Sequence, residues 1–425
     1  MGFLTGKKGK AISIALIALF AAGVILWAAT APPPYIRIHP PIEMGEVPQG
    51  VTDVQAEGDP LGELLVEMKD LPGHDEIVLQ EDLGRAFVTC MDGKIWKVDF
   101  IANTAEPFVD PPLMAAGARQ IPGDPDTIVF CTSYLHGASY PKDERVGIYK
   151  LSISTKQVAP LLTRAPVIPE TYAIPGENTG AVYTGENFKP LKIDEMTGQN
   201  SRALMFCNDL DVSRDGKRIY FSEPFAYEGA SMGGGAVAEA ISLGKNGMLW
   251  RLDLEDGSVG LVGRGYSFLD GVLLEYENGD RETSVLITET IKFRIVRLQL
   301  EGAKAGKDRV LWKDLPGMPD GLDRDAKGRV WAGLLKRRSS LVNFIHAHPW
   351  IKPLFLRIPP SMVPAGKETG IIAFSPDCSQ ALYSTMHDGS VMSDISVVVP
   401  GRERIYLPRF DMESHGLYSM ENPLD

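Results

Sequence analysis

Short apolar runs separated by tight polar turns recur along most of this 425-residue chain. In an early example, the run at residues 87–89 is followed by Asp92-Gly93 and by a second run at residues 95–98. Such a pair predicts two antiparallel strands joined by a turn. Similar runs return near residues 128–151, 219–252, 285–298, 329–332 and 381–391. Repeated strand-rich units of roughly 40–50 residues are typical of a β-propeller, so we predict an all-β fold, a six-bladed β-propeller.

Two stretches interrupt this rhythm. Glycine-rich residues 229–235 lead into residues 236–241, whose composition predicts a short helix. Residues 336–359 also carry apolar side chains at helical spacing, at Leu341, Phe344 and Ile345. We therefore expect short helical inserts between strands. Two interpretations stay open for them: a lid over the channel mouth, or packing on the propeller surface alone.

The start of the chain predicts a membrane anchor. A basic tail, residues 1–10, precedes residues 11–30, which carry no charge. About 20 apolar residues suffice for a transmembrane helix. The preceding lysines predict a cytoplasmic N-terminus, with the rest of the chain on the periplasmic or extracytoplasmic side. A cleaved signal peptide is the alternative, because Ala29-Thr30-Ala31 has a small-x-small pattern, but the apolar run exceeds the usual length of about 7–15 residues.

Residues 31–60 are rich in proline and predict a linker, which leaves residues 61–425 for the propeller. The formal net charge is −12, and no basic patch follows residue 10. We therefore expect no nucleic-acid partner, since phosphate binding requires a basic surface.

The four cysteines, at positions 90, 131, 207 and 378, have no CxxC spacing, which weighs against a structural zinc site. We expect buried free thiols. An oxidising compartment leaves a disulfide open, and the sequence cannot pair the cysteines.

Four phrases place a carboxylate or amide just before a predicted strand. They contain Asp75-Glu76, Asn208-Asp209, Asp270-Gly271 and Asp320-Gly321. If these strands begin around one channel, their oxygen atoms converge and suit a hard cation, Ca²⁺ ahead of Mg²⁺. Taken singly, each phrase is also an ordinary turn sequence, because Asn-Asp and Asp-Gly favour turns.

These phrases resemble the strictosidine-synthase-like branch of the six-bladed calcium-dependent phosphotriesterase superfamily. This superfamily also holds paraoxonases, gluconolactonases and adipocyte plasma membrane-associated proteins. The resemblance spans residues 65–410 and is clearest at residues 208–212, 288–295, 315–321 and 338–350.

The resemblance implies a catalytic calcium held by a Glu, two Asn and an Asp. Asn208 matches the first Asn and Asp320 matches the Asp, whereas Asp270 stands in place of the second Asn and adds negative charge. Either Asp75 or Glu76 matches the Glu. Asp209 is expected to lie behind the ligands and hold them in position without binding the ion itself.

The implied activity is hydrolysis of small esters or lactones, of the arylesterase or lactonase type. His136, which follows a predicted blade strand, is the candidate general base, with an ordinary surface histidine as the alternative. Strictosidine synthases use a glutamate before the last strand, but residues 397–401 contain no carboxylate, so alkaloid condensation is not expected. A second hypothesis is a non-catalytic, calcium-stabilised propeller that binds a protein or cell-envelope ligand.

Overall fold

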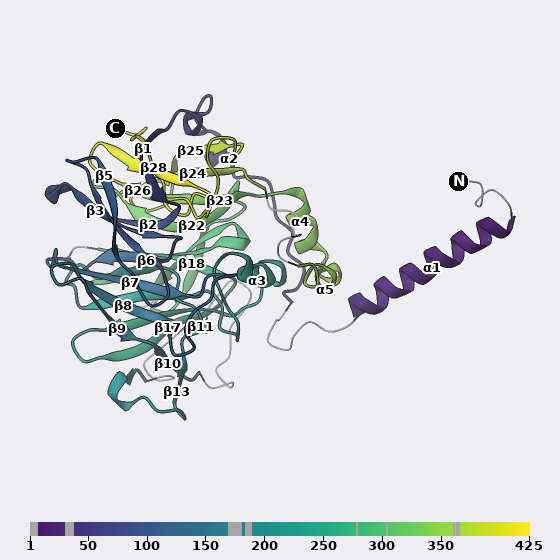
Figure 1. Cartoon of the computed structure of the whole chain (residues 1–425), viewed down its shortest axis with the longest axis horizontal. Coiled ribbons are helices and arrows are strands. Elements are labelled where there is room, and N and C mark those ends of the chain that lie inside the picture. Colours follow the sequence, from purple (N-terminus) through teal and green to yellow (C-terminus); the bar gives the residue numbers. More distant parts are fainter. Residues whose placement is uncertain are drawn as a thin grey trace.

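Six antiparallel sheets form a ring of blades in the computed structural model, which describes residues 7–29, 38–168, 181–182, 189–277, 279–302, 305–359, 362 and 366–425 (Figure 1). The predicted six-bladed β-propeller is thereby confirmed. Blade one contains β2 (His74–Gln80), β3 (Arg85–Cys90), β4 (Ile95–Asp99) and β5 (Thr104–Val109). Blade two contains β6 (Met114–Gln120), β7 (Thr127–Ser133), β8 (Gly147–Ser152) and β9 (Gln157–Leu162). Blade three contains β14 (Leu210–Val212), β15 (Arg218–Glu223), β16 (Gly247–Asp253) and β17 (Ser258–Tyr266).

The other three blades complete the ring. Blade four contains β18 (Leu269–Tyr276), β19 (Glu282–Glu289), β20 (Arg294–Gln299) and β21 (Asp308–Trp312). Blade five contains β22 (Gly317–Arg324), β23 (Val330–Arg337), β24 (Thr369–Phe374) and β25 (Ala381–His387). Blade six contains β26 (Val399–Pro400), β27 (Arg404–Tyr406), β28 (His415–Glu421) and β1 (Leu65–Pro72). The first strands of successive blades contact one another, from β2 through β6, β14, β18 and β22 to β26, so they form the inner ring.

The sixth blade closes the ring by joining the two ends of the propeller. Strand β1 pairs antiparallel with β28, so an early segment supplies the outermost strand of the last blade. The apolar run at residues 381–391 was expected to start a separate unit, and that assignment is wrong. It contains β25, the outer strand of blade five, because residues 404–421 and β1 supply the remaining blade.

Small accessory strands extend the third blade. The ribbon of β10 (Arg164–Pro166) and β13 (Ser201–Ala203) precedes it, while β11 (Ala181–Val182) and β12 (Leu191–Lys192) pair with the outer strand β17. Short 3-10 turns follow strands or connect them: η2 (Glu81–Leu83), η3 (Ile193–Glu195) and η5 (Thr290–Lys292).

Helix α1 (Lys7–Ala29) projects away from the propeller (Figure 1). Its segment Lys10–Trp27 is long and apolar enough to cross a membrane, and none of that segment is buried against the rest of the protein. This fits the single-pass anchor predicted at residues 11–30.

Of the predicted linker at residues 31–60, residues 31–37 lie outside the described residues. Residues 38–60 contact both helical inserts and blade five. Helix α2 (Gln49–Thr52) contacts β25 and buries Val51, and the turn η1 (Pro60–Gly62) buries Leu61. Apolar side chains inserted among the prolines provide the driving force for this packing.

Both predicted helical inserts are present. The first, η4 (Gly233–Ala236) with α3 (Val237–Ser242), lies between β15 and β16. The second, α4 (Ser340–Ala347), η7 (Pro349–Ile351) and α5 (Lys352–Phe355), lies between β23 and β24, and Ser339 caps α4 by accepting from Val342 N. Helices α3 and α5 touch, on the side of the propeller that carries α1 (Figure 1).

A disulfide joins blades two and three. Cys131 on β7 bonds to Cys207 just before β14, with Cα atoms 5.1 Å apart and a separation of 76 positions in the sequence. The expectation of buried free thiols holds for Cys90 and Cys378 and is wrong for the other two cysteines. Sequence spacing could not pair them, because the blade repeat brings the two positions together only in the folded ring.

Loss of this cross-link should destabilise the propeller. Replacing both Cys131 and Cys207 by Ser is expected to lower the free energy of unfolding by about 4 kcal/mol, because a long loop is no longer closed in the unfolded chain. Urea denaturation with and without dithiothreitol measures the effect. Reductant should weaken the parent protein and leave the double variant unchanged; a parent protein that is indifferent to reductant would contradict the cross-link.

Candidate functional site

All six blades meet at one small cavity on the propeller axis. Its volume is about 20 Å³, which is room for a single water-sized or ion-sized occupant. Blade one contributes Asp75 and Glu76, blade two Gly117, blade three Asn208 and Asp209, blade four Asp270, blade five Asp320 and Gly321, and blade six Ser396 and Val397. The structure therefore brings together every residue that the sequence suggested as a metal ligand.

Bulges in the inner strands explain why these residues face the axis. The pairing register shifts between His74 and Glu76 in β2, and between Leu269 and Val272 in β18. It also shifts between Pro319 and Leu322 in β22. A bulge adds an unpaired residue and re-aims its side chain, and Asp75, Asp270 and Asp320 are those residues.

Hydroxyl groups on the second strand of three blades accept the backbone N–H groups at these irregular positions. Thr89 Oγ1 accepts from Glu76 N at 3.0 Å, Ser222 Oγ accepts from Asp209 N at 3.0 Å, and Thr288 Oγ1 accepts from Gly271 N at 2.7 Å. Since an unpaired buried N–H is unfavourable, these side chains make the irregular backbone stable.

Close approach between blades requires glycine at two of these places. A Cβ on Gly117 would lie 2.5 Å from Asp209 Oδ1, and a Cβ on Gly271 would lie 2.4 Å from Asp320 O. Gly117 N donates instead to Asn208 O at 2.8 Å. The absence of a side chain thus lets neighbouring inner strands hold Asn208 and Asp320 against the axis.

The polar side chains around the cavity contact one another directly. Asn208 donates a short hydrogen bond from Nδ2 to Asp270 Oδ1, and Thr290 Oγ1 lies 3.5 Å from Asp270 Oδ2. Asp320 lines the same cavity as Asp270, and repulsion between these two carboxylates raises the pKa of Asp320.

Burial and mutual repulsion both disfavour the ionised forms of these carboxyl groups. Burial raises the pKa of Asp75 and of Asp320 well above the ordinary aspartate value, and repulsion from Asp270 raises both further. Burial likewise raises the pKa of Asp270. A cation among them would reverse this balance by stabilising the ionised forms.

The structure distinguishes the two acidic residues of blade one. Glu76 Oε2 accepts from Arg119 Nη1 at 2.5 Å, and Glu76 Oε1 accepts from Ile77 N at 3.0 Å. Asp75 also lines the cavity, but among the described residues no hydrogen bond or ion pair engages its carboxylate, and only its backbone O accepts, from Ser396. The geometry therefore favours Asp75 over Glu76 as the free oxygen donor of this blade.

Asp209 joins blade three to blade four. Its Oδ1 accepts from Leu210 N at 2.8 Å and its Oδ2 accepts from Val272 N at 2.8 Å. Both oxygens are thus engaged by backbone amides, and the residue braces the strands that carry Asn208 and Asp270.

Arg119 was missed by the sequence reasoning. From β6 its guanidinium bonds Glu76 and donates from Nη2 to Leu322 O at 3.1 Å. Nearby Asp323, Asp209 and Asp211 also raise its pKa. A single basic residue in an inner strand was the available signal, because an isolated charge there must be paired in the folded channel.

The donor set fits a hard cation, since it consists of carboxylate and amide oxygens. Among the residues that the structure describes, however, no group of three or more His, Cys, Asp or Glu side chains stands arranged as a finished metal site. Asp270 accepts hydrogen bonds from Asn208 and Thr290, so binding an ion at Asp270 requires it to exchange those bonds for the ion.

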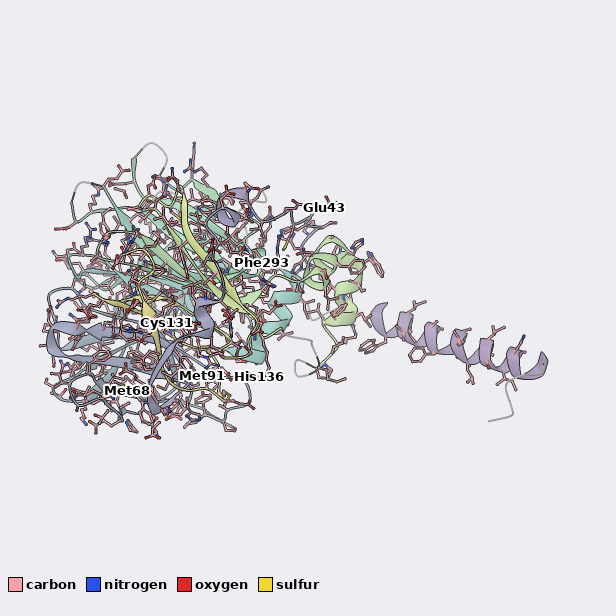
Figure 2. All side chains as sticks on the ribbon, turned by 90° about the horizontal axis from the view of Figure 1, so that it is seen from above. Glu43, Met68, Met91, Cys131, His136 and Phe293 are labelled. Carbon is pink, nitrogen blue, oxygen red and sulfur yellow. A yellow bond between two sulfur atoms is a disulfide. The ribbon has the colours of Figure 1, made fainter. Side chains whose placement is uncertain are left out.

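His136 lies apart from this cavity. It is exposed after β7, its backbone N donates to Met232 O at 3.1 Å, and a Cβ on Gly234 would lie 2.7 Å from its Cδ2 (Figure 2). It therefore packs against the glycine-rich part of the first helical insert, and it is not among the residues that line the axial cavity.

Comparison with known proteins agrees with the predicted resemblance. No family model matches the chain. It is 30% identical over 179 residues to the adipocyte plasma membrane-associated protein of Salmo salar, covering 41% of each chain. It is 30% identical over 172 residues to protein strictosidine synthase-like 10 of Arabidopsis thaliana, covering 40% of this chain and 42% of that protein. The matches thus span about two fifths of the length of these relatives.

Among solved structures, a gluconolactonase from Xanthomonas campestris superposes with a TM-score of 0.51. It is 14% identical and covers 93% of this chain and 99% of its own. At that identity the likeness concerns the fold. The chain is thus a six-bladed β-propeller whose homologues are adipocyte plasma membrane-associated and strictosidine synthase-like proteins, as its motifs predict.

Proposed function

We propose that this protein is a membrane-anchored, calcium-dependent hydrolase of small esters or lactones. The observation that carries the proposal is the meeting of Asp75, Asn208, Asp270 and Asp320 from four blades in a cavity of about 20 Å³. These residues would hold the ion.

A calcium ion in this cavity supplies Lewis acidity toward a carbonyl or phosphoryl oxygen and stabilises the negative charge of the transition state. The protein's own residues position that chemistry. Asp209 and the three bulge-supporting hydroxyls fix the backbone of the ligands, and Arg119 neutralises Glu76 behind them. Ser396 donates from Oγ to Asp75 O at 2.7 Å and holds blade six against blade one.

The substrate would approach from the face where the inner strands begin. In each blade, the connection between the second and third strands lies on this face. The two helical inserts and His136 belong to such connections. Contact between α3 and α5 gives the inserts the position of a cover. His136 stays our candidate base, brought to the substrate by the glycine-rich segment that packs on it.

The anchor and the disulfide support an extracytoplasmic propeller. Helix α1 is apolar and unburied, and its Trp27 ring lies 5.9 Å from the Arg357 guanidinium beside α5. A disulfide between Cys131 and Cys207 is expected in an oxidising compartment. Under this proposal, the lysines in the first turn of α1 would keep the N-terminus in the cytoplasm.

The first test is metal-dependent turnover. The full-length protein in detergent should bind one Ca²⁺ by calorimetry, hydrolyse phenyl acetate or a simple lactone, and lose that activity with EDTA until calcium is restored. Asp320→Ala should remove both properties, whereas Asp323→Asn, a change on the same strand but outside the cavity, should keep them.

Two results would decide against the proposal. Absence of calcium binding by the parent protein would remove the metal site altogether. Tight calcium binding lost in Asp320→Ala, without turnover of any ester or lactone, would leave the calcium-stabilised binding propeller.

The extra charge at Asp270 gives a second test. Asp270→Asn should raise the free energy of unfolding in EDTA by roughly 1 kcal/mol, because it removes one buried charge from the repelling set. The same change should weaken calcium binding about tenfold or more. Thermal melts of the parent protein and of Asp270→Asn, each with EDTA and with calcium, measure both effects. If the variant melted at the same temperature as the parent in each condition, Asp270 would not face the ion.

The third test concerns His136. His136→Gln should lower kcat by about 10²-fold or more, the usual contribution of a general base, without changing calcium affinity. His415→Gln, at another exposed histidine, is the matched control. Unchanged turnover in His136→Gln would assign His136 to the surface.

A further inference from the structure

A second pocket lies away from the axis, between the N-terminal segment and blade five. Its volume is about 300 Å³, at the lower end of the range for small-molecule sites. One wall comes from residues 47–55, and the other from the ends of β23 and β25 with the start of α4. No residue lines both this pocket and the axial cavity.

A buried arginine borders this pocket. The Arg338 side chain is 8% exposed, and its Nη1 is shielded from solvent without a hydrogen bond. The guanidinium carbon also lies 6.0 Å from the centroid of the Phe293 ring. Guanidinium has five N–H donors, and leaving the buried donors of Nη1 without a hydrogen bond is unfavourable.

The nearest carboxylate compensates Arg338 only in part. Asp314 Oδ1 lies 3.6 Å from Arg338 Nη1, beyond hydrogen-bond distance, and the same oxygen accepts from Gly45 N at 2.9 Å. Arg337 also lines the pocket, but it is exposed and pairs with Glu368 at 2.7 Å. The lining therefore contains two arginines and no acidic residue.

The rest of the lining indicates what else a ligand must contain. Val47, Val51, Pro316 and Met386 supply apolar surface. The Asn343 amide borders the pocket with a buried, unpartnered Oδ1, and a rotated amide would present its NH₂ group to an anion instead. The pocket thus combines an anion-binding end with an apolar wall.

We propose that this pocket binds a small monocarboxylate with a short apolar tail. Its carboxylate accepts from the Arg338 guanidinium, whose planar fork matches a carboxylate with two parallel hydrogen bonds. The tail lies against Val47, Val51 and Met386. Because Val47 and Val51 belong to the segment that leads from α1, the ligand also fastens that segment to blade five.

Hexanoate is a suitable probe, tested by calorimetry on the full-length protein in detergent with EDTA present. We expect saturable binding of one hexanoate, with hexanamide binding at least about tenfold more weakly because it lacks the charge. Arg338→Gln should weaken hexanoate about tenfold or more, whereas the neighbouring Arg337→Gln should change it less than about threefold. Hexanoate should also raise the melting temperature of the parent protein.

Two further variants keep the test decisive. Val47→Trp fills the pocket from its partly exposed wall and should abolish binding even if Arg338→Gln fails to fold. Asp320→Ala should bind hexanoate like the parent, which separates this pocket from the axial cavity. Equal affinity for hexanoate and hexanamide, or undiminished binding in Arg338→Gln or Val47→Trp, would overturn the proposal.

Discussion

Like charges gathered at the propeller axis are the constraint on which the rest of this structure depends. Asp75, Asp270 and Asp320 are brought together from separate blades, and burial with mutual repulsion raises the pKa of Asp75 and Asp320 well above the usual value. Such an arrangement opposes folding unless something offsets it. A divalent cation among the carboxylates would offset it.

Holding these charges in place requires bonds that run between blades. Asp209 accepts from Val272 N, Asp211 accepts from Leu274 N at 2.8 Å, and Thr288 donates to Asp320 O at 3.0 Å. The first two bonds join the inner strands of blades three and four, and the third joins the second strand of blade four to the inner strand of blade five. The disulfide at Cys207 adds a covalent link immediately before Asn208. The site is therefore stiffened around its whole circumference, which is what a preorganised cation site needs.

Sequence patterns predicted the elements that depend on local chemistry. The blade rhythm, the two inserts and the four acidic phrases follow from periodicity and turn residues, and the structure has them. The choice of Asp75 over Glu76 did not follow, because it depends on Arg119 from the next blade, 43 residues away. The sixth blade was misassigned for a related reason: β1 and β28 pair across nearly the whole chain, and no local signal records that pairing.

The N-terminal segment has two tasks in this fold. Strand β1 closes the ring, and residues 38–60 before it pack on blade five, where Val51 and Leu61 are buried. The N-terminal segment also forms a backbone hydrogen bond with each helical insert. His39 N donates to Ser242 O at 2.9 Å, and Ile42 N donates to His346 O at 3.0 Å. The chain that leaves α1 is thus in contact with both helical inserts before it enters the propeller. A displacement of this segment would therefore act on both inserts and, through α2 and β1, on blades five and six directly.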